Sequence, residues 1–188
     1  ATDALAAVAA VFHVLNHATF KASLFMAVGI VDHETGTRDM RVLRGLRRAM
    51  PYTAALAVVA SAAMAGVPLL NGFLSKEMFF AETTHVGGTE DWSMSVAAVA
   101  MGIFSVAYSL RFIATVFFGP QATDLPKAPH EPPAWMRRPV ELLVLICLVV
   151  GILPALTLGQ IVNTAARSVA GPDLPYYKIA IWHGVNAP

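Results

Sequence analysis

Three basic side chains recur once per helical turn inside an apolar stretch of the sequence, which reads H-V-L-N-H-A-T-F-K from His13 to Lys21. His13, His17 and Lys21 stand at positions i, i+4 and i+8, so an α-helix would place them on one slowly drifting face. A lysine near the centre of a bilayer costs about 2.5–3.5 kcal/mol on insertion scales. Such groups therefore face protein or water, and in membrane proteins they often carry protons or ions.

The chemistry that these residue types favour is proton transfer. Histidine titrates near physiological pH, and burial or a neighbouring cation disfavours the charged form of a lysine. A Lys–His–His series bridged by water is therefore a candidate proton wire. The alternative is an interhelical hydrogen-bond network without a role in transport. A metal site is not expected, because lysine is a poor third ligand and no carboxylate shares this face.

A second candidate, Lys76, follows a stretch whose sequence interrupts a helix. The apolar segment 51–83 would be about 50 Å long as one straight helix, well beyond a hydrocarbon core of about 30 Å. Pro68 lacks an amide donor and disfavours helix at the residue before it. The sequence predicts a broken helix, with one half from Tyr52 to about Gly66 and the other from Ser75 to about Thr83.

The position of Lys76 just after this break suggests an ion site. Irregular backbone at membrane depth is tolerated only against protein or water, and secondary transporters build ion sites at such breaks. The alternative is a salt bridge between Lys76 and Glu77 or another acid. Glu77 itself is interpreted as a structural residue that stabilises the N-terminus of the second half-helix.

The composition is that of a membrane protein. Of the 188 residues, 56% are hydrophobic and 13% charged, with a mean hydropathy of +0.61, whereas soluble domains carry roughly 25% charged residues. The net charge of +1 says nothing about nucleic acid, but the sequence has no basic block with interleaved aromatics, so no nucleic-acid partner is expected. The single cysteine excludes a disulfide framework and a thiolate metal site. No phosphate loop or haem or iron–sulfur ligand set occurs, so neither a cofactor nor enzyme activity is expected.

Four apolar segments exceed the roughly 20 residues needed to cross a bilayer. They span residues 4–31, 51–83, 93–118 and 139–166, and the last is expected to kink at Gly151 and Pro154. The expected fold is an all-α polytopic membrane helix bundle of about four spans with one discontinuous helix. The start at Ala1, without a methionine, suggests that the sequence begins inside a longer protein.

The loops between these segments alternate in basic charge. Loop 32–50 holds five Lys or Arg residues, loop 84–92 none, loop 119–138 three and the tail after residue 166 two. The positive-inside rule places the first and third loops in the cytoplasm, and the second loop and both chain ends outside. Asp39 and the five arginines are interpreted as a solvated loop that sets this topology. The alternative is a docking surface for another protein of a membrane complex.

Four motifs carry a resemblance to one family. They are H-V-L-N-H-A-T-F-K-A-S-L-F, H-E-T-G-T-R-D, M-A-G-V-P-L-L-N-G-F-L-S-K-E and Ile181-Trp182-His183-Gly184. The chain resembles the large subunit of the Mrp-type multisubunit cation/proton antiporters, which is similar to the antiporter-like membrane subunits of respiratory complex I. The H-E-T-G-T-R-D loop and the Trp-His-Gly tail favour the Mrp side. Ile181 and Val185 depart from the Leu and Phe expected in the tail.

The resemblance implies a subunit that exchanges H⁺ for a monovalent cation, with Na⁺ expected, in a bacterial plasma (inner) membrane and alongside other small membrane subunits. In that family a polar axis runs along mid-membrane. The lysine matched by Lys76 sits at the break of a discontinuous helix, and residues matched by His13, His17 and Lys21 link it to the axis. Residues 1–166 would form the C-terminal part of the antiporter-like core, and residues 167–188 an interfacial tail leading to further membrane segments.

Two other functions stay open at this point. One is a proton-pumping membrane subunit of a respiratory NADH:quinone oxidoreductase, which keeps its redox centres in other subunits. The other is a purely structural scaffold. The sequence that follows this chain would separate the first two, because the Mrp protein continues into many more spans whereas the complex I relative ends in a long lateral helix.

Overall fold

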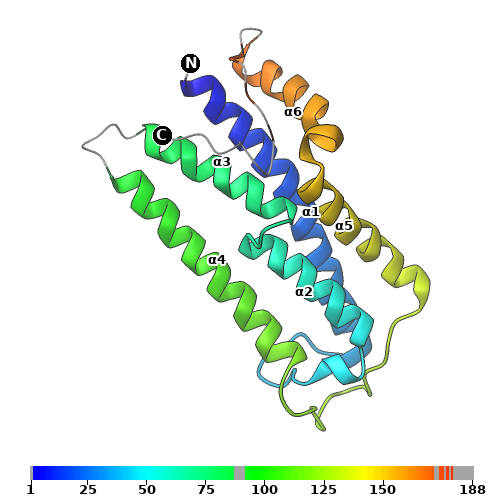
Figure 1. Cartoon of the computed structure of the whole chain (residues 1–188). Helices are drawn as coiled ribbons and strands as arrows, with labels where there is room; N and C mark the ends of the chain where they lie inside the picture. The colour runs from blue at the N-terminus through cyan, green and yellow to red at the C-terminus, as the bar shows by residue number, and fades with distance from the viewer. Residues whose placement is uncertain (1, 87–91, 172–173, 176, 178, 180–188) are drawn as a thin grey trace.

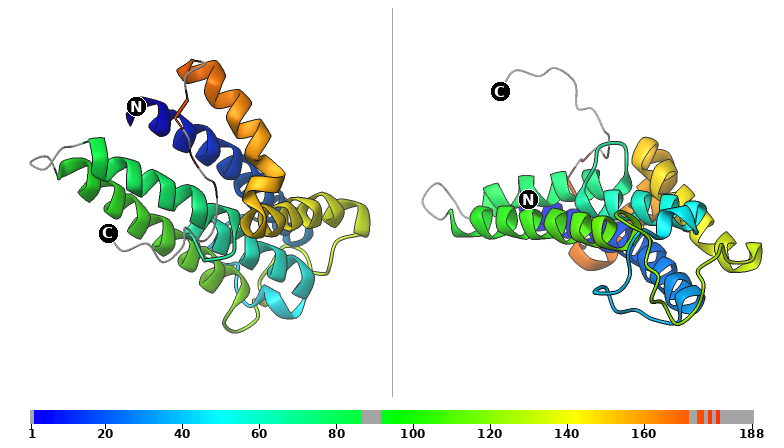
Figure 2. Two further views of the ribbon diagram at one scale, coloured as in Figure 1. Left: turned by 45° about the horizontal axis from the view of Figure 1, so that its top comes forward. Right: turned by 90° about the horizontal axis from the view of Figure 1, so that it is seen from below.

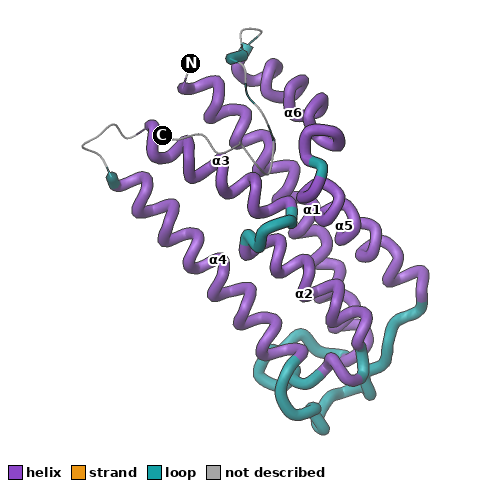
Figure 3. Tube along the Cα trace, viewed as in Figure 1, coloured by secondary structure: helices purple, strands orange, loops and turns teal. Residues whose placement is uncertain are grey.

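The computed structural model describes residues 2–86, 92–171, 174–175, 177 and 179, and all regular structure in these ranges is helical (Figure 3). The predicted all-α fold is confirmed. The Trp-His-Gly motif, most of the tail and residues 87–91 lie outside the described residues. The elements are α1 (Thr2–Thr35), the 3₁₀ turn η1 (Leu46–Arg48), α2 (Pro51–Ala65), α3 (Asn71–Val86), α4 (Ser93–Phe117), α5 (Ala134–Ile152) and α6 (Pro154–Ala170).

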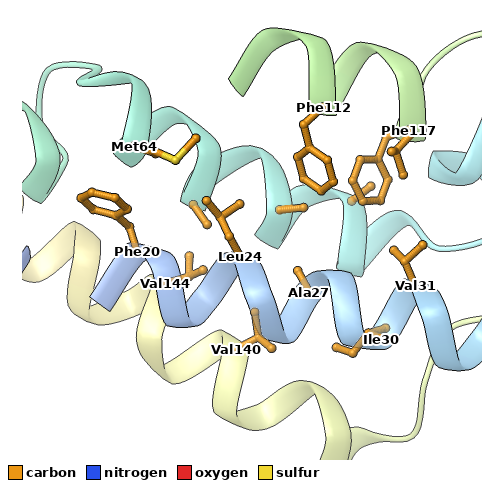
Figure 4. Packing of buried hydrophobic residues seen from close by; sticks show 14 of the residues in the cluster. Phe20, Leu24, Ala27, Ile30, Val31, Met64, Phe112, Phe117, Val140 and Val144 are labelled. Atoms are coloured by element: carbon orange, nitrogen blue, oxygen red, sulfur yellow. The ribbon is translucent and has the colours of Figure 1, made fainter. Parts of the chain in front are cut away.

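Helix α1 is the central element of the bundle. It packs against α2, α3, α5 and α6, whereas α4 packs mainly against α2 and α3 (Figures 1 and 2). Figure 4 shows Phe20 and Leu24 of α1 meeting Met64 of α2 and Val144 of α5. Lipid tails are as apolar as these side chains, so close packing rather than exclusion of water holds such helices together.

The predicted discontinuous helix is confirmed as α2 and α3. Helix α2 ends at Ala65, and Gly66 follows with φ 89°, a left-handed conformation that glycine adopts without strain. Helix α3 starts at Asn71, four residues before the predicted Ser75, and continues to Val86. The backbone already turns before Asn71, since the Phe73 N–H group donates to the Leu70 carbonyl at 3.1 Å.

The predicted segment 139–166 forms two separate helices rather than one kinked helix. Helices α5 and α6 are bent by 94° relative to one another, and Leu153 between them is not helical. Pro154 begins α6, where its missing N–H group is not needed. Helices α1 and α4 are each long and apolar enough to span a membrane, and the bent pair can count as a third span. The second predicted span, which forms α2 and α3, is not among these candidates, because α2 is a shorter apolar helix of 15 residues.

Two glycines let other backbones approach the break closely. A Cβ atom on Gly72 would lie 1.8 Å from the carbonyl oxygen of Ala63, and one on Gly151 would lie 2.2 Å from that of Leu69. Both distances are far below van der Waals contact, and in each case the opposing atom is backbone. The lack of a side chain at these two glycines therefore allows the end of α2, the break and the end of α5 to pack closely together.

The two basic loops meet at the same end of the bundle, as the charge pattern predicts (Figure 1). Arg44 in loop 36–50 lies 3.7 Å from Asp124 in loop 118–133. Glu131 then accepts hydrogen bonds from the backbone N–H groups of Tyr52 (2.6 Å) and Thr53 (3.1 Å). A carboxylate at this place satisfies donors that the first turn of α2 leaves unpaired.

The H-E-T-G-T-R-D motif closes the end of α1 against the same loop. Glu34 is buried with 3% exposure, and its carboxylate lies 3.0 Å from Nδ1 of His33 and 3.1 Å from Nδ1 of His130. Burial of a carboxylate is costly unless polar groups surround it. The contact therefore joins α1 to a loop almost a hundred residues later in the chain.

Loop 36–50 also contains a local ion pair. The Asp39 carboxylate accepts hydrogen bonds from Nη2 (2.6 Å) and from the backbone N–H (2.9 Å) of Arg41. These bonds hold the pKa of the Asp39 side chain below its ordinary value of 3.8, at about 2. The loop is therefore a charged, solvated turn, in line with its interpretation from the sequence.

Replacing Gly72 by alanine is expected to destabilise the fold by about 1–3 kcal/mol or more, because the new methyl group would overlap backbone that cannot move aside. The matched control is Gly29→Ala on α1, where a Cβ would meet nothing within 4 Å. Thermal unfolding of the detergent-solubilised protein measures both. Equal melting temperatures for the two variants would contradict the close approach at Gly72.

The Asp39 carboxyl is expected to titrate at about pH 2 in the folded protein. A pKa lowered by folding means that the contact stabilises the loop above pH 3.8 and that this stabilisation is lost as the pH falls through about 2. Carboxyl ¹³C NMR of the labelled protein follows the titration. Arg41→Ala should return the midpoint toward 3.8, whereas Arg38→Ala, whose guanidinium pairs with Asp32, should not. A wild-type midpoint near 3.8 would show that the pair is not formed in solution.

Candidate functional site

The four side chains singled out in the sequence, His13, His17, Lys21 and Lys76, line one cavity of about 430 Å³. It lies among α1, α3 and α4, and the end of α2 closes one side. The cavity is otherwise lined by aromatic, methionine and small residues and one tyrosine: Phe20, Met64, Phe80, Met101, Gly102, Phe104, Ser105 and Tyr108. The predicted wire residues are thus neighbours of the lysine at the break.

The basic stripe, His13, His17 and Lys21, lies at the edge of the packed face of α1. Phe12, Asn16 and Phe20 occupy the most buried positions, each with at most 1% exposure. His13 and Lys21 are half-buried beside them, and His17 is exposed. The one-turn spacing therefore gives a common face, as predicted, but the face borders the cavity rather than the core.

The basic stripe contacts residues of α3 and α4. Nδ1 of His13 lies 3.2 Å from the Ser75 hydroxyl, and the rings of His13 and His17 are 5.9 Å apart. Nζ of Lys21 lies 5.7 Å from the ring centroid of Tyr108, within the range of a cation–π contact. Within the part of the chain that is described, no hydrogen bond joins two of the four basic groups, so a proton passing between them would need water.

Lys76 is held at the end of α2. Its Nζ donates to the Met64 carbonyl at 2.6 Å and to the Ser105 hydroxyl at 2.9 Å. The Met64 carbonyl has no partner within the helix, because the residue four positions later is Pro68, which lacks an N–H group. Carbonyls at a helix C-terminus carry partial negative charge and favour a cation. The break therefore creates the acceptor on which Lys76 rests.

A second cavity of about 790 Å³ lies on the other side of Lys76, bounded by α2, α3 and α4. Glu77 lines it and is exposed. Glu77 is the seventh residue of α3, so the interpretation that it stabilises the N-terminus of this helix is wrong, because α3 starts at Asn71 rather than at Ser75. Among the described residues, Lys76 forms no ion pair with Glu77, and its hydrogen-bond partners are the two oxygens on α2 and α4.

Polar groups continue into the interface of α1 and α3 beside the break. The Asn71 amide donates to the Asn16 carbonyl at 3.4 Å. Nδ2 of Asn16 and Oδ1 of Asn71 are buried without a hydrogen-bond partner among the described atoms. A buried polar group without a partner costs free energy, so packing alone does not explain why two amides stand at this interface.

Three contributors were missed from the sequence: Ser75, Ser105 and Tyr108. Ser105 and Tyr108 are three residues apart, which places them on one face of α4, and this spacing was the available signal. Nothing in the sequence indicates which helix that face meets. Among the described residues no group of three or more His, Cys, Asp or Glu side chains could hold a metal ion. The site offers groups that can take up and release protons.

Comparison with known proteins places this geometry in a family. A sequence model of the family described as "NADH:quinone oxidoreductase/Mrp antiporter, TM" matches residues 2–105, which include the stripe, the break and Ser105. The Mrp complex from Dietzia sp. DQ12-45-1b is a similar structure, with a TM-score of 0.79 and 38% sequence identity, over 95% of this chain and 19% of that chain.

Two curated relatives match nearly the whole chain. The probable A/B subunit of a K(+)/H(+) antiporter from Rhizobium meliloti is 63% identical over 186 residues, covering 98% of this chain and 19% of the relative. The A subunit of a Na(+)/H(+) antiporter from Bacillus subtilis is 40% identical over 195 residues, covering 97% and 24%. The chain thus spans about a fifth to a quarter of the length of these relatives. Because the family match covers more than half of its residues, this chain belongs to the NADH:quinone oxidoreductase/Mrp antiporter transmembrane family, and its relatives confirm the resemblance to the Mrp-type antiporters.

Proposed function

We propose that this chain forms part of the large subunit of a monovalent cation/proton antiporter, and that Lys76, His13, His17 and Lys21 carry protons through it. The observation that supports this most is the place of Lys76. Its ammonium group bonds the Met64 carbonyl, which the broken helix leaves without a partner of its own, and it lines two cavities. A lysine so placed can exchange its proton with groups in either cavity.

The proton path of the proposal uses contacts on α1 and α3. Ser75 and His13 are within hydrogen-bonding distance, and Ser75 stands next to Lys76 in the chain. A histidine and a hydroxyl can each accept one proton while giving up another. Water in the cavity of about 430 Å³ would connect His13 with His17 and Lys21. In this role the chain moves ions and performs no chemical transformation.

The proposals for the transported cation and for the surroundings rest on the resemblance to the family. Na⁺ is the cation proposed here, and K⁺ is the one in the name of the Rhizobium meliloti relative. We place the chain in a bacterial plasma membrane beside other membrane subunits, with loops 36–50 and 118–133 in the cytoplasm. Residues 1–166 would be the C-terminal part of the antiporter core, and residues 167–188 the start of further membrane segments.

The complex I alternative has less support. The family description covers both kinds of protein, but the two relatives are named as antiporter subunits and the similar structure is an Mrp complex. A proton-pumping subunit would use the same lysine and histidines. The distinction is therefore whether proton movement depends on a monovalent cation, which proton exchange in vesicles with Na⁺, with K⁺ and with neither decides.

Lys76→Ala, introduced into the complete antiporter complex, is expected to abolish cation-dependent proton exchange in inverted vesicles. The matched control is Lys127→Ala, whose ammonium bonds the His33 carbonyl at the far end of α1 and should leave exchange intact. Native gel electrophoresis verifies assembly of both variants. Wild-type exchange in the assembled Lys76→Ala complex would overturn the proposed function.

His17→Ala is expected to slow exchange at least about tenfold, which corresponds to about 1.4 kcal/mol on the barrier. Val14→Ala, on an exposed position of the same helix, should slow it less than about twofold. Only the first change removes a group that can pass a proton on. Initial rates of vesicle alkalinisation compare the two variants, and equal rates would favour the packing role over the wire.

A further inference from the structure

Three helices converge on one carbonyl at the break. The Met64 carbonyl oxygen at the end of α2 accepts hydrogen bonds from Lys76 Nζ on α3 at 2.6 Å and from Ser105 Oγ on α4 at 2.9 Å. Lys76 Nζ and Ser105 Oγ are themselves 2.9 Å apart. The three polar groups form a closed triangle in which each contacts the other two.

We propose that Ser105 is a positioning residue for Lys76, a role that rests on the proposed function of this lysine as a proton carrier. A serine hydroxyl has one donor and two acceptor sites. Ser105 can therefore donate to the Met64 carbonyl and accept from the lysine at the same moment. This fixes the ammonium group against the end of α2, where the proton must be released.

Ser105 also keeps the Met64 carbonyl hydrogen-bonded when the lysine has moved away. A buried carbonyl without a partner costs free energy. When Lys76 leaves, the Ser105 hydroxyl still donates to the Met64 carbonyl, so this cost does not arise. The serine thereby narrows the free-energy difference between the bound and the displaced lysine and speeds the exchange between the two cavities.

Gly66, which contacts the stem of Lys76, leaves room for the lysine to move between the cavities. A Cβ atom on Gly66 would lie 3.1 Å from Cδ and 3.8 Å from Nζ of Lys76. The lysine stem therefore crosses the end of α2 over a residue without a side chain. Gly66 lines the larger cavity and Ser105 the smaller one, so Lys76 rests on the boundary between them.

The chain supplies a matched control one turn along α4. Ser109 is buried, and its hydroxyl donates to the Ser105 carbonyl of its own helix at 2.7 Å. Within the described parts of the chain, its side chain forms no hydrogen bond with Lys76 or Met64. Ser109→Ala removes the same atoms from the same helix without touching the triangle.

The experiment compares Ser105→Ala, Ser105→Thr and Ser109→Ala in the complete complex, in vesicles with the amount of assembled complex measured. Ser105→Ala is expected to lower the maximal exchange rate about tenfold, which corresponds to about 1.4 kcal/mol. The half-saturating Na⁺ concentration should stay unchanged, because Ser105 acts on the proton carrier. Ser105→Thr keeps the hydroxyl and should restore at least half of the rate, and Ser109→Ala should stay within twofold of wild type.

Several outcomes would overturn the inference. Equal rates for Ser105→Ala and Ser109→Ala would show that the hydroxyl does not matter. A loss that Ser105→Thr fails to restore, or that disappears when rates are divided by assembled complex, would make the role structural. A changed half-saturating concentration would assign Ser105 to the cation instead. Lys76→Ala separates the two proposals: wild-type exchange in that variant rejects both, whereas an inactive Lys76→Ala beside an unaffected Ser105→Ala rejects only the role of Ser105.

Discussion

The structure depends on one constraint: a helix that breaks inside a membrane must find partners for the carbonyls at its end. Water is scarce there, and an unpaired polar group costs several kcal/mol. Here the carbonyl of Met64 finds its partners in Lys76 on α3 and Ser105 on α4. The same carbonyl supplies the partial negative charge that makes a lysine acceptable at this depth. The break and the lysine thus stabilise one another.

The packing around the break serves this contact. Gly72 lets α3 approach the end of α2, and Gly151 lets the end of α5 approach the irregular residues from behind. A side chain at either position would overlap the opposing backbone and force the helices apart. The bend between α5 and α6 then lets Val162 and Ala166 of α6 pack near Val8 and Phe12 in the first half of α1, where the basic stripe begins.

Local signals in the sequence predicted the end of α2 and the place of Lys76, because Pro68 and Gly66 act on their own neighbours. They also predicted a kink at Gly151 and Pro154, but neither its size of 94° nor the start of α3. Gly72 and Gly151 weaken a helix by propensity, and only the close approach of Ala63 and Leu69 explains why they stand at those positions.

The candidate site was likewise predictable only in part. The one-turn spacing of the stripe is a property of the helix itself and predicted a shared face, whereas Ser105 could not be predicted, since its partner Met64 lies 41 residues earlier and only the packing of α4 on α2 joins them.

The charges around the two cavities give the proposed transport a direction. Among the described residues, the smaller cavity is lined by four basic side chains and no carboxylate, whereas Glu77 lines the larger one. Like charges repel more strongly in a low-dielectric interior than in water. A proton that arrives on the stripe of α1 therefore disfavours an ammonium group at Lys76 and pushes it toward the side of Glu77. Because Lys76 lines both cavities, a proton that binds in the smaller cavity would drive the Lys76 proton into the larger one.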